Sequence, residues 1–505
     1  MYELVSPVSP AAVLKYIGYF LIAFSLVLIV PSMAAILLQD NYAAIIYGLT
    51  SVLTFAAGFA IYRLIPEYDL EVKDAVIISA LVFPISAFIS AFPMAVTNNM
   101  SYIDAFFESV SAVTTTGLSV APADSSMVFL FARSWAQWIG GIGIIIIVVA
   151  VLIHPGTAAF RIYKTQYSQI KLFPNVLKTT RLLGTLYILL TLVAIILLLI
   201  SGMSLFDSVC HALSSVSTGG FSTRSASIGA FDNPLILFSI SLASFLGAVS
   251  FGLYIKSGRK PSRMLKSSEL QWLVLICIIG FAVLLFTTIR SEGFDSNSED
   301  ILFLAISAVS TSGFSTVDVS IYSDASKWVI SVLMWIGGST GSTAGGIKIL
   351  RLLVLAKLIK IVFMRVFLPV EVITPLKLDN DRIKKEEINN IVVFSVLYIS
   401  ILVFSAYVFM FYGVNSADSI FEVSSALGTV GLSAGVTGPD MPDVLKMVLC
   451  ADMLLGRIEI IPLLILVMPR TWIKRRTDRV HTPDQQKECS GSCQQRRRCP
   501  SNLPQ

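Results

Sequence analysis

The chain has 505 residues, of which 55% are hydrophobic and only 14% are charged. This composition excludes a soluble protein of the same size and is typical of a polytopic membrane protein. The formal net charge of +5 is an incomplete guide, because basic and acidic residues occupy different segments of the chain.

Ten apolar stretches are predicted to be membrane-spanning helices. Each is long enough, at about 1.5 Å per residue, to cross roughly 30 Å of hydrocarbon. They cover residues 12–37, 43–62, 75–97, 126–153, 182–203, 234–255, 270–290, 327–364, 388–412 and 443–468. The first stretch lacks the cleavage pattern of a removed signal peptide, so we retain it as a span.

Basic segments predict the orientation of the spans. Residues 154–181 and 256–266 contain Lys and Arg but no acid, and further basic residues follow the last span. The positive-inside rule places these segments and both termini in the cytoplasm of a multi-pass plasma (inner) membrane protein. The opposite loops carry acids, which predicts an acidic outer mouth that concentrates cations. These acids are Asp124, Asp232, Glu292, Asp295, Asp318, Asp324, Asp440 and Asp443.

A Gly-centred pattern occurs four times on the predicted outer side, as TTTGLS (114–119), STGGFS (217–222), STSGFS (310–315) and GTVGLS (428–433). We name these segments loops 1 to 4. The aligned glycines are Gly117, Gly220, Gly313 and Gly431. A threonine stands two positions before each glycine, a serine two positions after it, and an aspartate thirteen positions before it.

A short helix is predicted before each loop. Ser101, Ser204, Asn297 and Asn415 are N-cap candidates that stand three residues before an acid. About 12 helical residues, or roughly 18 Å, reach only half-way into a bilayer, and the chain must return by irregular backbone. Such backbone is tolerated at that depth only inside protein or beside a watery cavity. Four surface turns without a special role are the alternative, but they do not explain links of this length.

We therefore predict an all-α polytopic membrane protein with four tandem membrane–pore–membrane repeats and an N-terminal two-helix hairpin. The expected units are a hairpin at 1–70, repeats at 71–160, 161–266, 267–370 and 371–475, and a disordered cytoplasmic tail at 476–505. The second span of each repeat contains glycine near its middle, which permits close helix approach or a break. In the third repeat, Gly337–Lys348 (GGSTGSTAGGIK) is too rich in Gly, Ser and Thr to be a well-formed helix. We name Gly337–Lys348 the glycine-rich segment.

The composition of the loops suggests their chemistry. Rings of backbone oxygens replace the hydration shell of a monovalent cation such as potassium. The negative C-terminal ends of four short helices would stabilise that ion further. No carboxylate lies within the loops, which argues against divalent cations.

The single-glycine loops and the run GGSTGSTAGGIK resemble the Trk/Ktr/HKT superfamily of potassium transporters, over about residues 10–470. The two extra N-terminal spans resemble the Trk-type membrane (pore) subunit. The resemblance implies potassium uptake, a homodimer with one pore per protomer, and a cytoplasmic nucleotide-binding (NAD or ATP/ADP) regulatory subunit. It implies potassium at the filter carbonyls and no organic cofactor in this chain.

The resemblance also assigns site residues. The implied selectivity filter consists of Thr115, Thr116, Gly117, Thr218, Gly219, Gly220, Thr311, Ser312, Gly313, Thr429, Val430 and Gly431. The implied intramembrane gate consists of Gly337, Gly338, Gly341, Gly345, Gly346, Lys348 and Arg457. The column before the filter glycine varies (Thr116, Gly219, Ser312, Val430), which leaves the fine selectivity open.

Arg457 lies inside the span 443–468, where a buried arginine costs at least ~2.5–3.5 kcal/mol. It is either a structural partner of Glu459 or of another carboxylate, or a cationic side chain beside the pore that helps to set the gate. Lys348 has the same gate role or marks the inner end of its helix.

Other features are expected to be structural. His211 has no partner histidines nearby in the sequence, so packing or a hydrogen bond is expected rather than a metal. Cys210, Cys277 and Cys450 are expected to be core residues, and the spacing of Cys489, Cys493 and Cys499 is a poor zinc pattern. We expect no enzyme activity and no nucleic-acid partner, with membrane lipid as the surroundings. The alternatives are an ion-coupled (H⁺ or Na⁺) potassium symporter and a less selective K⁺/Na⁺ transporter.

Overall fold

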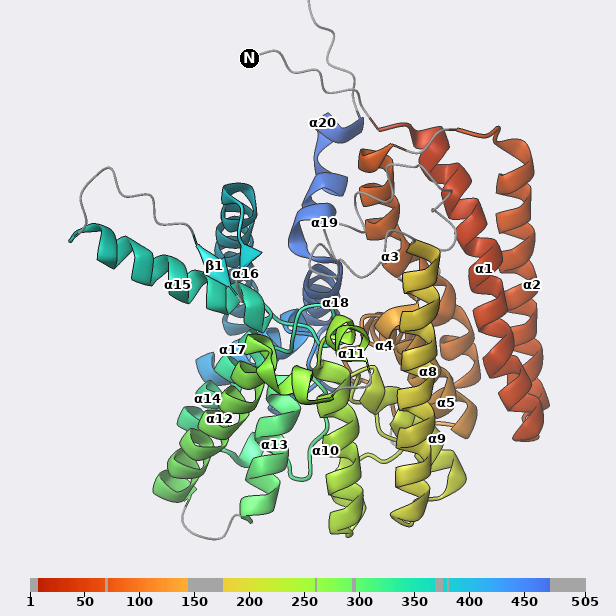
Figure 1. The fold of residues 1–505 in the computed structure, drawn as a ribbon. Coiled ribbons are helices and arrows are strands. Elements are labelled where there is room, and N and C mark those ends of the chain that lie inside the picture. Colours follow the sequence, from red (N-terminus) through yellow and green to blue (C-terminus); the bar gives the residue numbers. More distant parts are fainter. Residues whose placement is uncertain are drawn as a thin grey trace, which may run out of the picture.

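The computed structural model describes residues 8–68, 71–122, 124–143, 176–258, 261–292, 297–367, 376–378 and 381–472. Most of the described chain is helical (Figure 1). Its strands are the short antiparallel pair β1 (Lys377–Leu378) and β2 (Asp381–Arg382). Most of the basic segment 154–181 and the expected tail 476–505, with its three cysteines, lie outside the described residues.

The first two helices form a hairpin on one flank of the bundle (Figure 1). They are α1 (Pro10–Leu37) and α2 (Asn41–Leu64), and the side chains of Ser9 and Asp40 cap their first turns. Glycine permits their close approach, because a Cβ at Gly58 would lie 2.8 Å from the backbone nitrogen of Ile22. The hairpin packs on α3 (Val72–Thr97) and on α5 (Met127–Trp138).

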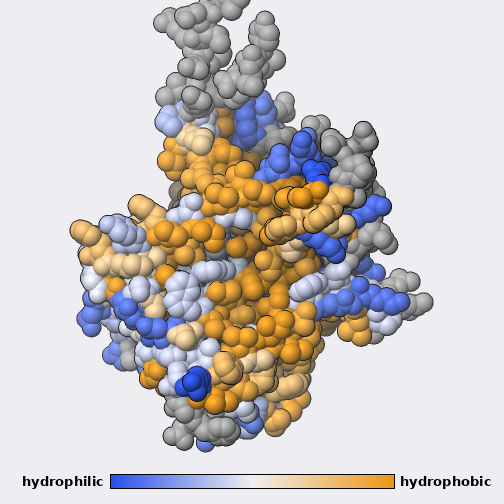
Figure 2. Space-filling view, turned by 90° about the vertical axis from the view of Figure 1, so that its left-hand side faces the viewer, coloured by the Kyte–Doolittle hydropathy of each residue, from blue (hydrophilic) through white to orange (hydrophobic). Residues whose placement is uncertain are grey.

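In the described part of the chain, six helices are long and apolar enough to cross a membrane. They are α1, α2, α3, α8 (Val176–Ile200), α12 (Ser268–Glu292) and α16 (Lys385–Phe411). Apolar residues cover a broad central part of the face in Figure 2. The prediction of a polytopic helical membrane protein agrees with this surface.

The other expected spans are not single straight helices. Helix α5 passes into a π-helical turn (Ile139–Gly143), and the rest of that span lies outside the described residues. Helix α10 (Pro234–Ala248) bends by 84° into α11 (Phe251–Ser257). The bend follows Gly247, one of the mid-span glycines at which the sequence permits a break.

The last two of the expected spans are also interrupted. The glycine-rich segment separates α14 (Asp324–Ile336) from α15 (Ile349–Arg365), as the sequence predicts. Glu459, with φ of 68°, separates α18 (Asp443–Ile458) from α19 (Ile460–Val467). The predicted single span 443–468 is thus two helices. The remaining short elements are η2 (Ser227–Ala230), η3 (Pro261–Lys266), η4 (Val319–Ile321) and α20 (Pro469–Trp472).

Close backbone contact explains why glycine stands near these breaks. A Cβ at Gly247 would lie 2.6 Å from the carbonyl oxygen of Val216, at the end of a short helix. A Cβ at Gly140 or Gly456 would collide with the carbonyl of Val113 or Leu427, which hold the same place in other short helices. These three glycines therefore lie against the last residue of the short helix that precedes them in the sequence.

The short helices occur where the sequence predicts them. They are α4 (Tyr102–Val113), α9 (Leu205–Val216), α13 (Ser298–Ser310) and α17 (Ser416–Leu427). Ser101 and Ser204 accept the expected cap bonds, at 3.1 Å from the backbone nitrogens of Asp104 and Asp207. The two asparagines occupy the N-cap positions of α13 and α17 but accept no side-chain cap bond there.

The helices follow a cyclic order. Each short helix packs against the long helix before it: α4 on α3, α9 on α8, α13 on α12 and α17 on α16. It also packs against a helix that follows one of the other short helices: α9 on α5, α13 on α10, α17 on α14, and α4 on α18. The last of these contacts joins the end of the chain to its beginning and closes the circle.

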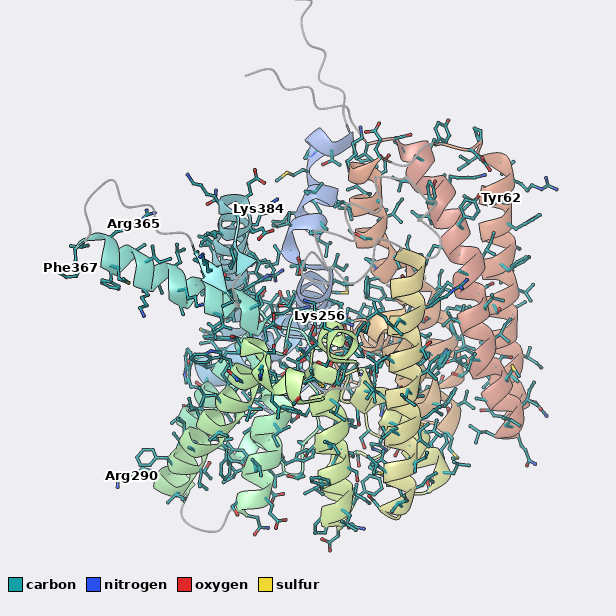
Figure 3. The ribbon with its side chains drawn as sticks, in the orientation of Figure 1. Tyr62, Lys256, Arg290, Arg365, Phe367 and Lys384 are labelled. Carbon is teal, nitrogen blue, oxygen red and sulfur yellow. The ribbon has the colours of Figure 1, made fainter. Side chains whose placement is uncertain are left out.

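The labelled basic side chains lie at different heights of the bundle, with Lys256 near its middle (Figure 3). Arg290 lies at the lower end of α12, whereas Arg365 and Lys384 lie toward the upper side in the same view. Arg365 and Phe367 lie at the outer end of α15, which projects sideways from the bundle. The free cysteines Cys210, Cys277 and Cys450 are buried, as expected of core residues.

Candidate functional site

The four loops share one unusual backbone conformation. The threonine two positions before each glycine has a positive φ, which is a genuine outlier for a β-branched residue. The φ values are 56° at Thr115, 53° at Thr218, 54° at Thr311 and 48° at Thr429. All four threonines are fully buried. Strained backbone of this kind persists only where the surroundings over-determine it, and it clusters at functional sites.

A serine in the last turn of each short helix holds the residue after the threonine. The N–H of Thr116 donates to the carbonyl of Ser111 at 2.9 Å, and the N–H of Gly219 to that of Ser214 at 2.7 Å. Ser312 and Val430 donate in the same way to Ser307 (2.9 Å) and Ser425 (2.8 Å). The sequence analysis missed these serines, although each stands six positions before its glycine.

The four glycines form a closed ring. A Cβ at Gly117 would collide with the carbonyl oxygen of Gly219 and lie 3.3 Å from the Cα of Gly220. A Cβ at Gly220 would likewise collide with Ser312, one at Gly313 with Val430, and one at Gly431 with Thr116. The glycines have φ between 72° and 101°. Space and backbone conformation therefore both require glycine at all four positions.

An open cavity of about 810 Å³ lies against this ring. All four glycines line it, together with the serines that follow them: Ser119, Ser222, Ser315 and Ser433. Among its described lining residues, Arg133 and Arg224 are basic and Asp318 is acidic. Both arginines are paired with carboxylates, Arg133 with Glu108 and Arg224 with Asp207, so the acidic outer mouth stays a prediction. Asp324 and Asp443 lie in the first turns of α14 and α18, where an acid stabilises the helix dipole.

Buried polar side chains support the loops from behind. Glu108 Oε1 accepts from Ser119 Oγ (2.7 Å) and from the N–H of Val120 (2.6 Å). Glu422 Oε1, at the aligned position, accepts from Ser433 Oγ (2.6 Å) and from the N–H of Ala434 (2.8 Å).

His211 stands at the aligned position behind loop 2. Its Nε2 is 2.9 Å from Ser222 Oγ and its Nδ1 is 2.8 Å from the carbonyl oxygen of Asp207. The prediction that His211 makes a hydrogen bond is confirmed. No group of three or more metal-ligating side chains occurs in the described part of the chain.

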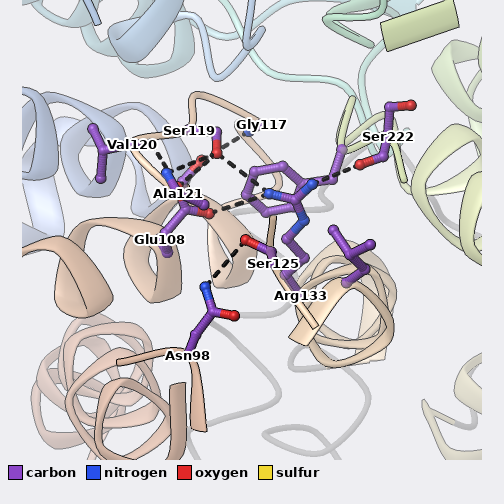
Figure 4. A network of polar contacts seen from close by, with 12 residues as sticks. Asn98, Glu108, Gly117, Ser119, Val120, Ala121, Ser125, Arg133 and Ser222 are labelled. Carbon is purple, nitrogen blue, oxygen red and sulfur yellow. Dashed lines mark hydrogen bonds and ion pairs between the residues drawn. The ribbon is translucent and has the colours of Figure 1, made fainter. Parts of the chain in front are cut away.

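Arg133 is buried at the junction of loops 1 and 2 (Figure 4). Its Nη1 lies 3.6 Å from Glu108 Oε2 and donates to Ser119 Oγ at 3.3 Å. Its Nη2 donates to the carbonyl of Ser222 at 2.6 Å. Its guanidinium lies over the ring of Phe221, 4.6 Å from the centroid. The sequence analysis missed Arg133, because it lies in an apolar span and no local pattern separates it from a lipid-facing arginine.

The glycine-rich segment lies against the inner ends of the short helices. Thr343 Oγ1 donates to the carbonyls of Val216 (3.1 Å) and Gly247 (3.0 Å). The N–H of Gly345 donates to Thr311 Oγ1 at 2.9 Å, and a Cβ on Gly345 would collide with Thr429 Oγ1. One segment thus contacts residues that adjoin loops 2, 3 and 4.

Glycine is needed in this segment because of its backbone conformation and its close contacts. Gly337, Gly341 and Gly346 have φ of 67°, 75° and 72°. A Cβ at Gly338 would lie 2.9 Å from the carbonyl oxygen of Ala248. Lys348 also has a positive φ, of 73°, and its N–H donates to the carbonyl of Ile336 at 2.9 Å.

Arg457 connects the glycine-rich segment to the turn that follows α5. Its Nη1 donates to the carbonyl of Thr343 at 2.6 Å. Its Nη2 donates to the carbonyls of Gly140 (2.8 Å) and Gly141 (2.7 Å). Glu459, the alternative partner considered from the sequence, pairs with Arg351 at 2.5 Å. Arg457 therefore joins two broken spans through their backbone carbonyls.

The fold and the site together define a polytopic helical membrane protein in which buried short helices end in matched loops around one ring. The family model of TrkH, described as a cation transport protein, matches residues 44–473. The chain belongs to this family, and the resemblance to the Trk-type membrane subunit is confirmed. A cation transport family is not an enzyme class.

Several relatives support the assignment. The chain is 32% identical over 477 residues to the Trk system potassium uptake protein TrkG of Escherichia coli, covering 90% of this chain and 97% of that protein. It is 31% identical over 414 residues to an uncharacterized cation transporter of Methanocaldococcus jannaschii, covering 81% and 85%. The crystal structure of the potassium transporter TrkH from Vibrio parahaemolyticus is similar, with a TM-score of 0.81 and 26% identity over 92% of this chain and 99% of that one.

Proposed function

We propose that this protein mediates potassium uptake across the plasma membrane through a selectivity filter built from loops 1 to 4. The observation that carries the proposal is the closed ring, in which each glycine abuts the backbone of the next loop. Relatives over nearly the whole chain are potassium uptake proteins, which supports potassium as the transported ion.

The filter ligands in this proposal are backbone carbonyls of the twelve residues assigned from the resemblance. The shared strained conformation of the four threonines supports a common role for these positions. Backbone and hydroxyl oxygens, without a carboxylate in the loops, suit a monovalent cation. The membrane potential then contributes about 2.3 kcal/mol per charge per 100 mV to inward movement.

The architecture we propose is four membrane–pore–membrane repeats around one axis, with the unit boundaries expected from the sequence. The cyclic order of contacts between α5, α10, α14 or α18 and the next short helix supports it. The positive-inside rule then orients the loops and their cavity toward the outside, with both termini in the cytoplasm.

The glycine-rich segment is proposed to be the gate beneath the filter, with Lys348 and Arg457 as its charged residues. The hydrogen bond from Arg457 to Thr343 supports this assignment, because it links a fixed cation to the segment directly. A cation there opposes ion passage, and release of the segment would widen the path.

The proposed partners are a second copy of this chain and a cytoplasmic nucleotide-binding subunit. Helix α15 projects from the bundle and exposes Phe363 and Phe367, which supports burial of its outer end against a partner. The printed names of the relatives describe Trk systems, which supports a multi-component assembly. No organic cofactor is proposed for this chain.

The test is rubidium uptake in potassium-starved cells that lack their own importers. The wild type should take up rubidium, and Gly220→Ser or Gly313→Ser should abolish uptake, because either side chain collides with the next loop. Gly438→Ser is the matched control, since a Cβ at Gly438 meets nothing within 4 Å. Wild-type cells without uptake, or filter variants with normal uptake, would refute the proposal.

An ion-coupled symporter is the second candidate. Asp452 of α18 is a buried carboxylate within a span, and intramembrane carboxylates commonly carry coupling ions. One of its oxygens accepts from Ser405 Oγ at 2.9 Å, and the other has no hydrogen-bond partner among the described residues. Uptake that requires a proton or sodium gradient, and loses this requirement in Asp452→Asn, would favour the symporter.

A further inference from the structure

One junction of the ring differs from the other three. Arg133 and Gln137 are one helical turn apart on α5, and both reach loop 2. Gln137 Nε2 donates to the carbonyl oxygen of Gly219, and Gln137 Oε1 accepts from the N–H of Phe221 at 3.3 Å. Gln137 is fully buried. Loop 2 is therefore held on both sides of Gly220 by one side chain of the preceding repeat.

The same junction explains why the column before the filter glycine is uneven. A Cβ at Gly219 would lie 2.7 Å from Gln137 Nε2 and would collide with Cδ of the same amide. Loops 1, 3 and 4 carry Thr116, Ser312 and Val430 in this column. Gly219 thus provides the space that the amide of Gln137 occupies, and the two residues form one unit.

The other junctions lack such an amide. When the second spans are aligned on Gly140, Gly247, Gly337 and Gly456, the positions that match Gln137 hold Ser244, Met334 and Met453. Both methionines are fully buried. The side chain of a methionine has no N–H to donate.

A donor on Gly219 has a chemical consequence. A carbonyl oxygen has two lone pairs, and the amide of Gln137 engages one of them. The bond fixes the direction of this carbonyl and reduces its capacity to rotate toward a smaller ion. Selectivity between alkali cations depends on the number, field strength and freedom of such carbonyls.

We propose that Gln137 is a positioning residue that sets the discrimination between potassium and sodium by fixing the carbonyl of Gly219. The inference rests on the proposed function, since it assigns Gly219 to the filter. Gln137 acts through the backbone of loop 2 rather than by contact with the ion.

The test is Gln137→Met, which introduces the side chain that the third and fourth repeats hold at the matching position. We expect rubidium uptake to persist, with sodium competing about fivefold better, the effect of one lost hydrogen bond of ordinary strength. The KM for rubidium should rise more than the maximal rate falls. Gln271→Met, which changes an exposed glutamine of α12, should match the wild type.

A paired substitution covers the case in which Gln137→Met does not fold. Gly219→Ala alone should abolish uptake because of the collision with Gln137, and Gln137→Ala with Gly219→Ala should restore uptake with weakened discrimination against sodium. If both Gln137→Met and the double variant discriminate like the wild type while Gly220→Ser is inactive, the inference is wrong and the proposed function stands. If wild-type cells show no uptake, both are wrong.

Discussion

Individual buried side chains, rather than apolar packing alone, support the return of each loop. Glu108, His211 and Glu422 stand nine positions before the aligned glycine of their loop, and each bonds the serine two positions after it. Leu304 takes this place before loop 3, where Ser307 Oγ instead donates to the carbonyl of Phe314 at 2.7 Å. The supporting chemistry therefore differs between loops that share one backbone conformation.

Glu108 and Arg133 should stabilise the folded protein only when both are present. Arg133→Met should lower the free energy of unfolding by about 3 kcal/mol, since it leaves the buried carboxylate of Glu108 without its cation. Thermal and denaturant unfolding in detergent measure the change. The double variant Glu108→Gln with Arg133→Met should recover part of the loss. A single variant as stable as the wild type would contradict this reading of the contact.

Among the elements, the glycine-rich segment depends most on its neighbours. Its backbone N–H groups donate to carbonyls of α10 and α14 and to Thr311 of loop 3. The side chain of Thr343 donates to Val216 before loop 2, and Arg457 of α18 donates to the carbonyl of Thr343. A segment without helical hydrogen bonds of its own needs such partners to remain buried in a bilayer. Its position is consequently set by hydrogen bonds to several other elements rather than by secondary structure of its own.

Replacing Arg457 by alanine should raise cation flux by about tenfold. Hydrogen bonds to charged groups are worth about 1.5–3 kcal/mol, and about 1.4 kcal/mol changes an equilibrium constant tenfold. Loss of the bond to Thr343 should therefore favour the released segment, and loss of the cation lowers the barrier to ions. Rubidium flux into proteoliposomes measures this, with Arg290→Ala at the exposed end of α12 as the control. Unchanged flux through a folded variant would remove Arg457 from the gate.

The whole molecule closes through contacts between distant parts of the chain. Lys327 of α14 pairs with Asp418 of α17 at 2.8 Å, and Lys446 of α18 pairs with Asp104 of α4 at 2.5 Å. Both lysines stand ten positions before the glycine of their broken span. The second pair joins α18, near the end of the described chain, to α4 near its beginning, so it holds the circle of helices at the junction that no covalent link closes.

Loss of the Lys446–Asp104 pair should destabilise the folded protein more than a substitution at an exposed position. Lys446→Met should lower the free energy of unfolding by about 3 kcal/mol, because Lys446 is almost fully buried and its removal leaves Asp104 uncompensated. Lys360→Met, at an exposed position on α15, should have little effect. Unfolding in detergent distinguishes the two, and a double-mutant cycle with Asp104→Asn should show coupling. Equal stability of both lysine variants would mean that the pair does not hold the ring.

Local pattern was sufficient for much of the fold. The length of the short helices, the recurrence of the loops and the interruption at Gly337–Lys348 follow from hydropathy, capping residues and glycine content. The sequence pattern was insufficient where contacts with other elements decide the backbone geometry. Apolarity cannot distinguish a straight span from the 84° bend after α10, and an asparagine at an N-cap position does not ensure a cap bond.

The sequence by itself determined that the chain is a TrkH-family membrane protein with four matched loops. The hydropathy, capping residues and glycines that specify the spans, short helices and loops lie close together in the sequence. Only the tertiary structure decided which side chains surround those loops. Arg133 and Gln137 reach residues more than eighty positions away, and Lys446 reaches across 342 positions to Asp104. Contacts of that separation depend on the circular packing of helices, and no local periodicity encodes them.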